Sequence, residues 1–304
     1  MALISPILSL LFLAAEPLAA GDYTLEIAVA GESRETIVHV PESYDPEEPI
    51  PLVLCFHGAA SNARQQMRYC GLNSKADESG FIVVYPYGTG RVSGFRSWNA
   101  GNCCGYAQRE ETDELSFVTK LLDELEVRAN IDPRRIYATG ISNGGMLSYH
   151  LASEMSDRIA AIASVAGPMG YESCSPNRPV PILHFHGTTD TFVSIKGGPG
   201  TQRGANIEFY SLDHTISSWI DANGCDSTPD RTDMPDESED GMQVERYTYG
   251  GGREGSEIVL YKIIGGGHTW PGRQFLTGVL GPSTMDISAN DIIWDFFVKH
   301  PMPE

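Results

Sequence analysis

The chain has 304 residues, of which 41% are hydrophobic and 20% are charged, a balance that is ordinary for a folded globular protein and excludes a wholly disordered chain. Its formal net charge of −19 disfavours binding to nucleic-acid phosphates or to anionic membrane surfaces, because like charges repel. We therefore expect no nucleic-acid partner and no membrane association of the mature chain.

The first twenty residues differ in composition from the rest of the chain. Residues 1–15 form a nearly unbroken apolar run, which is shorter than a membrane-spanning helix needs but is typical of the core of a signal peptide. We predict a signal peptide over residues 1–20 and a secreted mature chain, extracellular or periplasmic, over residues 21–304. A buried N-terminal helix is the alternative, because no Lys or Arg precedes the apolar run.

Six cysteines, an even number, predict disulfide bonds in an exported chain, although the sequence does not say how they pair. We expect the adjacent Cys103 and Cys104 to bridge to different partners. No Cys-x-x-Cys pair occurs, so the cysteine spacing does not favour a zinc site. The other cysteines are Cys55, Cys70, Cys174 and Cys225.

Taken in chain order, apolar periodicity predicts an α/β fold. Alternating apolar and polar residues predict an opening antiparallel hairpin over 23–30 and 36–40. Continuous apolar runs predict strands buried on both faces at 52–56, 81–85, 136–139, 159–165 and 180–185. Helices are expected between and after them, at about 64–79, 115–125, 144–156 and 288–299. This alternation predicts a mostly parallel sheet with helices on both faces, in one domain over residues 21–304.

The segment Gly140-Ile-Ser-Asn-Gly144 lies between a predicted strand and a predicted helix. In such a Gly-x-Ser-x-Gly sequence the serine occupies a sharp, strained turn, where side chains on its neighbours would collide with the strand and the helix. The turn exposes the hydroxyl above the sheet. Ser142 is therefore the candidate nucleophile.

A serine hydroxyl needs a histidine base that is oriented by a carboxylate. In folds of this kind the partners follow in the order Ser, acid, His, on loops after later strands. Asp190 follows the predicted strand at 180–185, and His268 follows an apolar run that begins at Tyr261. We therefore predict that Asp190 is the acid and His268 the base, and that His186 holds the turn rather than taking part in the reaction.

Two backbone amides are candidates for an oxyanion hole, the pair of N–H groups that stabilises the negative oxygen of a tetrahedral intermediate. The amide of Asn143 follows the nucleophile and starts a helix. The second is the amide of Ala59, in the segment His57-Gly58-Ala59-Ala60 after an earlier strand.

Aromatic residues near these motifs could form a wall for a planar acyl group. We expect Trp98 and Trp270 to bind substrate, with Phe95 and Tyr106 beside them. The alternative is that both tryptophans pack in the core, as buried aromatic residues usually do.

Seven short segments together resemble the extracellular polyhydroxybutyrate depolymerase and feruloyl esterase group within carbohydrate esterase family 1. They are Phe56-His-Gly58, Ser97-Trp-Asn99, Cys103-Cys-Gly105, Gly140-Ile-Ser-Asn-Gly-Gly-Met146, His186-Gly-Thr-Thr-Asp190, Gly266-Gly-His-Thr-Trp-Pro-Gly272 and Ile293-Trp-Asp-Phe-Phe297.

The resemblance implies an α/β-hydrolase fold, a catalytic domain with no cofactor and no metal, and a triad of Ser142, Asp190 and His268. It implies a serine ester hydrolase acting on feruloyl or acetyl esters of plant polysaccharides or on polyhydroxybutyrate-type oligomers. Members of the group often carry a cysteine soon after the region of Tyr247 that could pair with Cys225, and none occurs here.

Three other functions stay open on the sequence alone. A serine peptidase on the same fold would share the triad. Metal chemistry could use His184 and His186, which project to the same face of a strand, together with Asp190 and His268. A non-catalytic binding protein could retain a hydrolase scaffold. The acidic segment 226–241 could also hold a calcium ion, although its carboxylates show no recognisable ligand spacing.

Overall fold

The computed structural model describes residues 16–29, 31–200, 207–274 and 277–304. Most of the predicted signal peptide lies outside these residues. Within the described part of that segment, Leu18 is buried, and its backbone N–H donates to the carbonyl oxygen of Arg128 at 2.8 Å. None of the described helices is long and apolar enough to span a bilayer.

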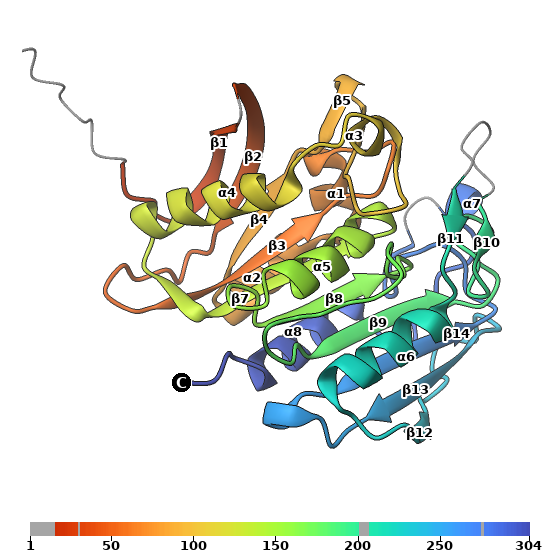
Figure 1. Ribbon diagram of the computed structural model, residues 1–304. Helices are drawn as coiled ribbons and strands as arrows, with labels where there is room; N and C mark the ends of the chain where they lie inside the picture. The colour runs from red at the N-terminus through yellow and green to blue at the C-terminus, as the bar shows by residue number, and fades with distance from the viewer. Residues whose placement is uncertain (1–15, 30, 201–206, 275–276) are drawn as a thin grey trace, which may run out of the picture.

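A ten-stranded sheet with the order β1-β2-β4-β3-β7-β8-β9-β14-β13-β12 forms the centre of the molecule (Figure 1). The strands from β4 to β14 in this order run parallel, and antiparallel strands extend both edges. The strands are β1 (Gly21–Val29), β2 (Glu32–Val40), β3 (Ile50–Phe56), β4 (Ile82–Pro86), β7 (Ile131–Ile141), β8 (Ala161–Val165), β9 (Ile182–Gly187), β12 (Asp230–Asp233), β13 (Gln243–Tyr249) and β14 (Ile258–Ile264).

Helices cover both faces of the sheet, with α4, α5 and α6 on one face and α1, α2 and α8 on the other (Figure 1). The helices are α1 (Ala63–Cys70), α2 (Leu72–Ser79), α3 (Gly105–Arg109), α4 (Glu114–Arg128), α5 (Asn143–Glu154), α6 (Leu212–Asn223), α7 (Thr277–Leu280), α8 (Ala289–Lys299) and the short 3₁₀ turn η1 (Arg253–Gly255). The small hairpins are β5 (Thr89–Val92) with β6 (Phe95–Ser97), and β10 (Gly198–Pro199) with β11 (Glu208–Phe209).

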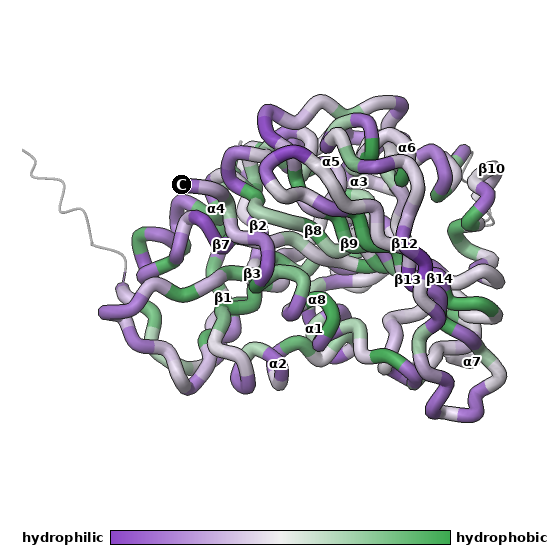
Figure 2. The backbone as a smooth tube through the Cα atoms, turned by 90° about the horizontal axis from the view of Figure 1, so that it is seen from below, coloured by the Kyte–Doolittle hydropathy of each residue, from purple (hydrophilic) through white to green (hydrophobic). Residues whose placement is uncertain are grey.

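The sheet separates two hydrophobic cores, because successive side chains of a strand point to opposite faces. In β3, Leu52 and Leu54 belong to the core under α4, α5 and α6, whereas Val53 and Cys55 belong to the core under α1, α2 and α8. Both sets are fully buried, and β3 is accordingly apolar along its length (Figure 2). The predicted α/β-hydrolase fold, with a mostly parallel sheet and helices on both faces, is confirmed.

The predicted helix at 64–79 is two helices. Gly71 adopts a left-handed conformation (φ 66°) and ends α1, with its N–H donating to the carbonyl oxygen of Met67, and α2 starts at the next residue. A glycine adopts this conformation without the steric cost of a side chain, so it breaks the helix where periodicity alone predicts continuity.

Candidate active site

Ser142 lies between the end of β7 and the start of α5, in a conformation that a side-chain-bearing residue rarely adopts. Its φ is 56° and its ψ is −124°, and its N–H donates to the carbonyl oxygen of Val165 at 2.8 Å. Strained backbone of this kind persists only where the surrounding structure enforces it, and such positions cluster at active sites. The predicted strand, sharp turn and helix around Gly-x-Ser-x-Gly are thus all present.

The glycines on either side of Ser142 permit close packing of this turn against the neighbouring strand β3. A Cβ atom at Gly140 or at Gly144 would collide with the carbonyl oxygen of Phe56. Larger residues would therefore push the turn away from the sheet and displace Ser142.

Asp190 and His268 follow β9 and β14, at the same carboxyl edge of the parallel strands as Ser142, and they contact each other. Nδ1 of His268 lies 2.6 Å from Oδ2 of Asp190, and both side chains are nearly fully buried. Because a carboxylate only accepts hydrogen bonds, Nδ1 carries the proton and donates it. In the neutral imidazole with this tautomer, Nε2 has the lone pair that a general base requires.

The turn after β9 holds the other oxygen of the same carboxylate. Oδ1 of Asp190 accepts the backbone N–H groups of Phe192 at 2.8 Å and Val193 at 2.9 Å. Burial alone would raise the pKa of Asp190, but the hydrogen bond and charge of His268, with help from His186 and Val193, outweigh it and lower the pKa. Asp190 therefore stays ionised beside the imidazole.

The two candidate oxyanion-hole amides belong to elements that meet at Ser142. Asn143 is the first residue of α5, and Ala59 follows β3 in a loop where a Cβ atom at Gly58 would lie 3.4 Å from Cβ of Ser142. Across the described residues, neither Ala59 nor Asn143 donates its backbone N–H to a backbone carbonyl. Both donors are thus available to a ligand.

The side chain of Asn143 fixes the position of its own backbone. Its Oδ1 accepts the backbone N–H of Trp98 at 2.7 Å, and its Nδ2 donates to the carbonyl oxygen of Trp98 at 3.0 Å. A buried amide that makes both bonds has little freedom to rotate. This role of the Asn143 side chain was not predicted from the sequence.

Trp98 and Trp270 are both fully buried, so the substrate-binding role expected for them is replaced by a packing role. The indole N–H of Trp98 donates to the carbonyl oxygen of His57 at 2.9 Å, and that of Trp270 donates to Oδ1 of Asn290 at 2.9 Å. Trp98 supports the oxyanion loop from beneath, and Trp270 anchors the segment after His268.

Phe192 is an aromatic residue that contacts the candidate base, and sequence reasoning missed it. Its ring centroid lies 5.3 Å from that of His268, and the side chain is half-buried. Its position two residues after Asp190 was the available signal, because the acid turn must approach the histidine.

His57 is a buried histidine. It holds the loop that carries the candidate amide of Ala59 and does not act as a second base. Its Nε2 accepts the backbone N–H of Gly88 at 3.0 Å, so Nδ1 carries the proton and donates to the carbonyl oxygen of Gly58 at 2.7 Å. Burial, opposed by the bond to Gly58 and helped by the charge of Arg96, lowers the pKa of His57 to about 4.

This pKa predicts that acid destabilises the folded protein. The unfolded chain takes up a proton on His57 near the ordinary histidine value, whereas the folded protein does so only near pH 4, so stability falls as the pH falls between these values. From about pH 7 to about pH 4 the contribution of His57 amounts to about 3 kcal/mol. We expect urea unfolding of His57→Gln to show a shallower pH dependence than wild type; equal slopes would contradict the prediction.

The structure does not bear out the expectation that Cys103 and Cys104 bridge to different partners. Their Sγ atoms lie against each other, and neither is bonded to another described cysteine. The described residues include four free thiols, and Cys225 is one of them. A wider disulfide framework stays a prediction.

The nitrogen atoms of His184 and His186 are occupied by hydrogen bonds within the protein, to Tyr149, to each other and to Val193. Within the part of the chain that the structure describes, no three His, Cys, Asp or Glu side chains converge as a metal-binding group. In the acidic segment, Oδ1 of Asp240 accepts the backbone N–H of Met242.

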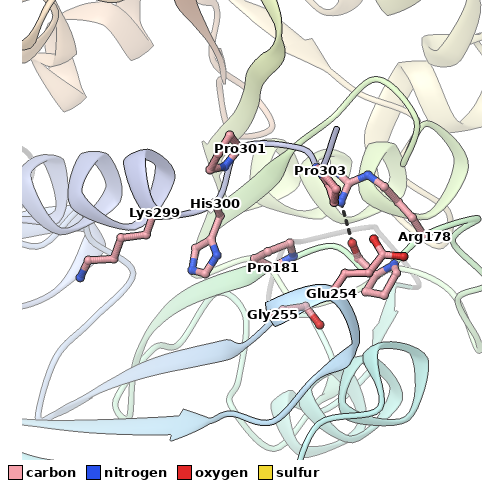
Figure 3. A pocket seen from close by; sticks show the side chains of 10 residues that line it. Arg178, Pro181, Glu254, Gly255, Lys299, His300, Pro301 and Pro303 are labelled. Carbon is pink, nitrogen blue, oxygen red and sulfur yellow. Dashed lines mark hydrogen bonds between the residues drawn. The ribbon is translucent and has the colours of Figure 1, made fainter.

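A cavity of about 200 Å³, whose lining Figure 3 shows, lies at the amino ends of β9 and β14, the opposite edge of the sheet from Ser142. Pro181 and Ser256, which precede β9 and β14, line it together with Arg178 and His300. Because substrate must reach the carboxyl edge of the strands, this cavity is not the catalytic pocket.

Together, the doubly covered parallel sheet, the strained serine turn and the buried Asp–His pair define the α/β-hydrolase class of protein. The model of the family described as esterase PHB depolymerase matches residues 38–194. The chain belongs to this family.

Relatives with assigned names are esterases. The chain is 30% identical over 285 residues to a protein of Nocardia uniformis subsp. tsuyamanensis named "Putative esterase NocK", covering 90% of this chain and 81% of that protein. It is 32% identical over 241 residues to feruloyl esterase B of Piromyces equi, covering 77% of this chain and 42% of that protein. It is 29% identical over 267 residues to a bifunctional acetylxylan esterase/xylanase of Neocallimastix patriciarum, covering 88% of this chain and 33% of that protein. The chain thus spans less than half the length of these two fungal proteins.

Solved structures support the fold. The acetyl xylan esterase from Aspergillus awamori matches with a TM-score of 0.57 at 15% identity, covering 81% of this chain and 94% of that one. A dienelactone hydrolase-like phosphotriesterase from metagenomic libraries matches with a TM-score of 0.59 at 14% identity, covering 93% of this chain and 99% of that one. The family match and the named relatives identify the chain as a carboxylic ester hydrolase.

Proposed function

We propose that this esterase is a secreted serine hydrolase that cleaves feruloyl or acetyl esters of plant polysaccharides, or hydroxyalkanoate oligomers, through an acyl-enzyme. The observation that carries the serine mechanism is the 2.6 Å bond between Nδ1 of His268 and Oδ2 of Asp190, because it directs Nδ1 at the carboxylate and keeps Nε2 free of that bond at the edge of the sheet where Ser142 lies.

In the proposed mechanism, Oγ of Ser142 attacks the ester carbonyl carbon while Nε2 of His268 takes the hydroxyl proton. Asp190 holds the imidazole in the required tautomer and stabilises the imidazolium. The N–H groups of Asn143 and Ala59 bind the oxyanion. The alcohol leaves with the proton from His268, and a water molecule then releases the acid by the same steps.

The substrate class rests on the named relatives and on one aromatic side chain. Feruloyl and acetylxylan esterases are among the relatives. Phe192 presents a half-buried ring beside His268, where the acyl or alcohol group of a bound ester would lie. A flat ferulate ring can pack against such a side chain.

The test is hydrolysis of methyl ferulate, acetylated xylan, hydroxybutyrate oligomers and a short-chain aryl ester by wild type and by Ser142→Ala. Cleavage that depends on Ser142 supports the serine mechanism, and the best substrate identifies the ester class. Folded protein that cleaves none of them but hydrolyses peptides would overturn the proposal in favour of a peptidase. Binding of an ester without turnover would favour a non-catalytic role.

The variant Phe192→Ala tests whether Phe192 contacts an aromatic acyl group but not a small one. We expect KM for methyl ferulate to rise about five- to tenfold, because an aromatic pair contributes about 1 kcal/mol beyond the burial of its area. KM for a short acetyl ester should change much less. Equal changes for the two substrates would show that Phe192 does not contact the acyl ring.

A further inference from the structure

Three polar side chains form a continuous buried chain of hydrogen bonds in the core beneath α5. The hydroxyl of Tyr149 lies 2.9 Å from Nδ1 of His184, and Nε2 of His184 lies 3.0 Å from Nδ1 of His186. Nε2 of His186 lies 2.9 Å from the carbonyl oxygen of Val193. All four residues are at most 3% exposed. The mechanism above uses none of these side chains.

The direction of every proton in this chain follows from its last member. A carbonyl oxygen only accepts, so Nε2 of His186 carries a proton and donates it to Val193. The remaining nitrogen of a neutral His186 then accepts from Nε2 of His184. By the same argument Nδ1 of His184 accepts the hydroxyl proton of Tyr149. One arrangement of protons therefore satisfies every group along the chain.

Both imidazoles are neutral in this arrangement, and their surroundings keep them so. Burial lowers the pKa of His184 well below its ordinary value, and the neighbouring His186 lowers it further. Burial also lowers the pKa of His186, although Asp190 and Val193 oppose the shift. A proton added to either ring would change this arrangement, because the hydroxyl of Tyr149 would then have to accept from His184 instead of donating to it.

This row of hydrogen-bonded side chains joins two elements that carry residues of the proposed triad. Tyr149 lies on α5, the helix that starts directly after Ser142. Val193 lies at the end of the acid turn, where its N–H donates to Oδ1 of Asp190 at 2.9 Å. The carbonyl of Val193 is therefore held by His186 while its N–H holds the carboxylate. His186 also lies directly beside Asp190, with Nε2 3.6 Å from Oδ2.

A buried polar chain of this length is a costly way to fill a core. Leu and Phe side chains would fill the same space without polar groups to satisfy, and each unsatisfied member of such a network costs free energy. A polar chain that is satisfied in one arrangement only fixes the geometry of the groups at its ends.

We infer that Tyr149, His184 and His186 are positioning residues that hold the turn Asp190–Val193, and through it the carboxylate of Asp190, against His268. The inference rests on the proposed triad. The three side chains touch neither substrate nor the reacting atoms; they act through the position of Asp190.

The first test is kcat and KM of His186→Phe, His186→Gln and Tyr149→Phe on an activated aryl ester. His186→Phe removes the donor to Val193, and we expect kcat to fall by up to about 100-fold with KM little changed, because displacement of a catalytic group by about 1 Å has that effect. His186→Gln retains an N–H donor at that end and should recover part of the loss. Tyr149→Phe, at the far end, should lower kcat least. A larger loss for Gln than for Phe would overturn the inference.

Ser148→Ala is the matched control for loss of a buried hydroxyl on the same helix. Its Oγ donates to the carbonyl oxygen of Gly144 and has no link to the acid turn. We expect kcat of this variant to stay near wild type. A loss equal to that of Tyr149→Phe would show a general effect of hydroxyl removal from α5 and would overturn the role of Tyr149.

The second test is a double-mutant cycle with Asp190→Asn. If His186 acts through the Asp190 carboxylate, His186→Phe should lower kcat much less in the Asp190→Asn background than in wild type. Fully additive losses between folded variants would overturn the inference. Activity retained by Asp190→Asn alone would instead contradict the proposed triad, so the two failures are distinguishable.

The third test needs no substrate. The proton between Nδ1 of His268 and Oδ2 of Asp190 should give a far-downfield ¹H NMR signal in wild type and in Ser148→Ala. We expect His186→Phe to shift or broaden this signal while the melting temperature shows a folded protein. An unchanged signal in folded His186→Phe would overturn the inference.

Discussion

Ser142→Ala is expected to lower kcat on every cleaved ester by about 10⁴-fold or more, because no other group replaces the serine oxygen as nucleophile. KM should change little, since the amides of Asn143 and Ala59 remain in place. Alanine keeps the unusual backbone conformation of Ser142 and loses only one oxygen atom, so the melting temperature should stay close to that of wild type. Steady-state kinetics and thermal unfolding of the purified variant measure both.

Ser148→Ala serves as the control here too, because it removes a buried hydroxyl six positions away on the helix that follows Ser142. Its activity should remain near wild type. A Ser142→Ala protein that retained a tenth or more of the wild-type kcat, after a contaminating esterase had been excluded by active-site titration, would contradict the assignment of the nucleophile.

The positions of the candidate residues Ser142, Asp190 and His268 could be predicted from the sequence because they depend on short local patterns. A strand followed by Gly-x-Ser-x-Gly and a helix requires a sharp turn at Ser142, and the structure shows that turn. Asp190 and His268 each follow a strand, and parallel strands end at one edge of the sheet, so residues 78 positions apart meet.

Side-chain burial could not be predicted in the same way. Trp98 and Trp270 lie next to site motifs, but whether an indole faces substrate or core depends on segments that pack over it. Phe56 and Phe117 flank Trp98 at ring-centroid distances of 5.3 and 6.4 Å. The hydroxyl of Tyr69 accepts the backbone N–H of Trp270 and helps to hold that residue in the core. These contacts are long-range, and local sequence carries no trace of them.

The fold could be predicted where apolar runs are long. The prediction failed where a single residue decides the local structure. The central strands were predicted to within a few residues because burial on both faces leaves a continuous apolar run. The break at Gly71 was missed because the residues on both sides of it are compatible with helix. The edge strand β12 was missed because all four of its residues are exposed, so it has no apolar pattern.

Asp190→Asn should lower kcat by about 10⁴-fold while leaving the fold intact. An asparagine can keep its oxygen toward the N–H groups of Phe192 and Val193, which then places its NH₂ group toward His268. An NH₂ group donates, so Nδ1 of His268 must accept, and its proton moves to Nε2. A histidine protonated at Nε2 cannot take the proton of Ser142. Steady-state kinetics at neutral pH measure the loss.

Asp286→Asn is the matched control, because Asp286 also accepts backbone N–H groups in a loop, those of Glu237 and Ser238. Among the described residues, its side-chain hydrogen bonds go to Glu237, Ser238 and Thr284 and not to the triad. Hydrogen bonding outweighs burial and lowers the pKa of Asp286, as it does for Asp190. Loss of one carboxylate charge from a hydrogen-bonded loop is thus common to both variants, whereas the tautomer of His268 changes only in Asp190→Asn. Equal kcat values for the two variants would mean that His268 does not depend on Asp190, and the buried pair would then be a structural contact alone.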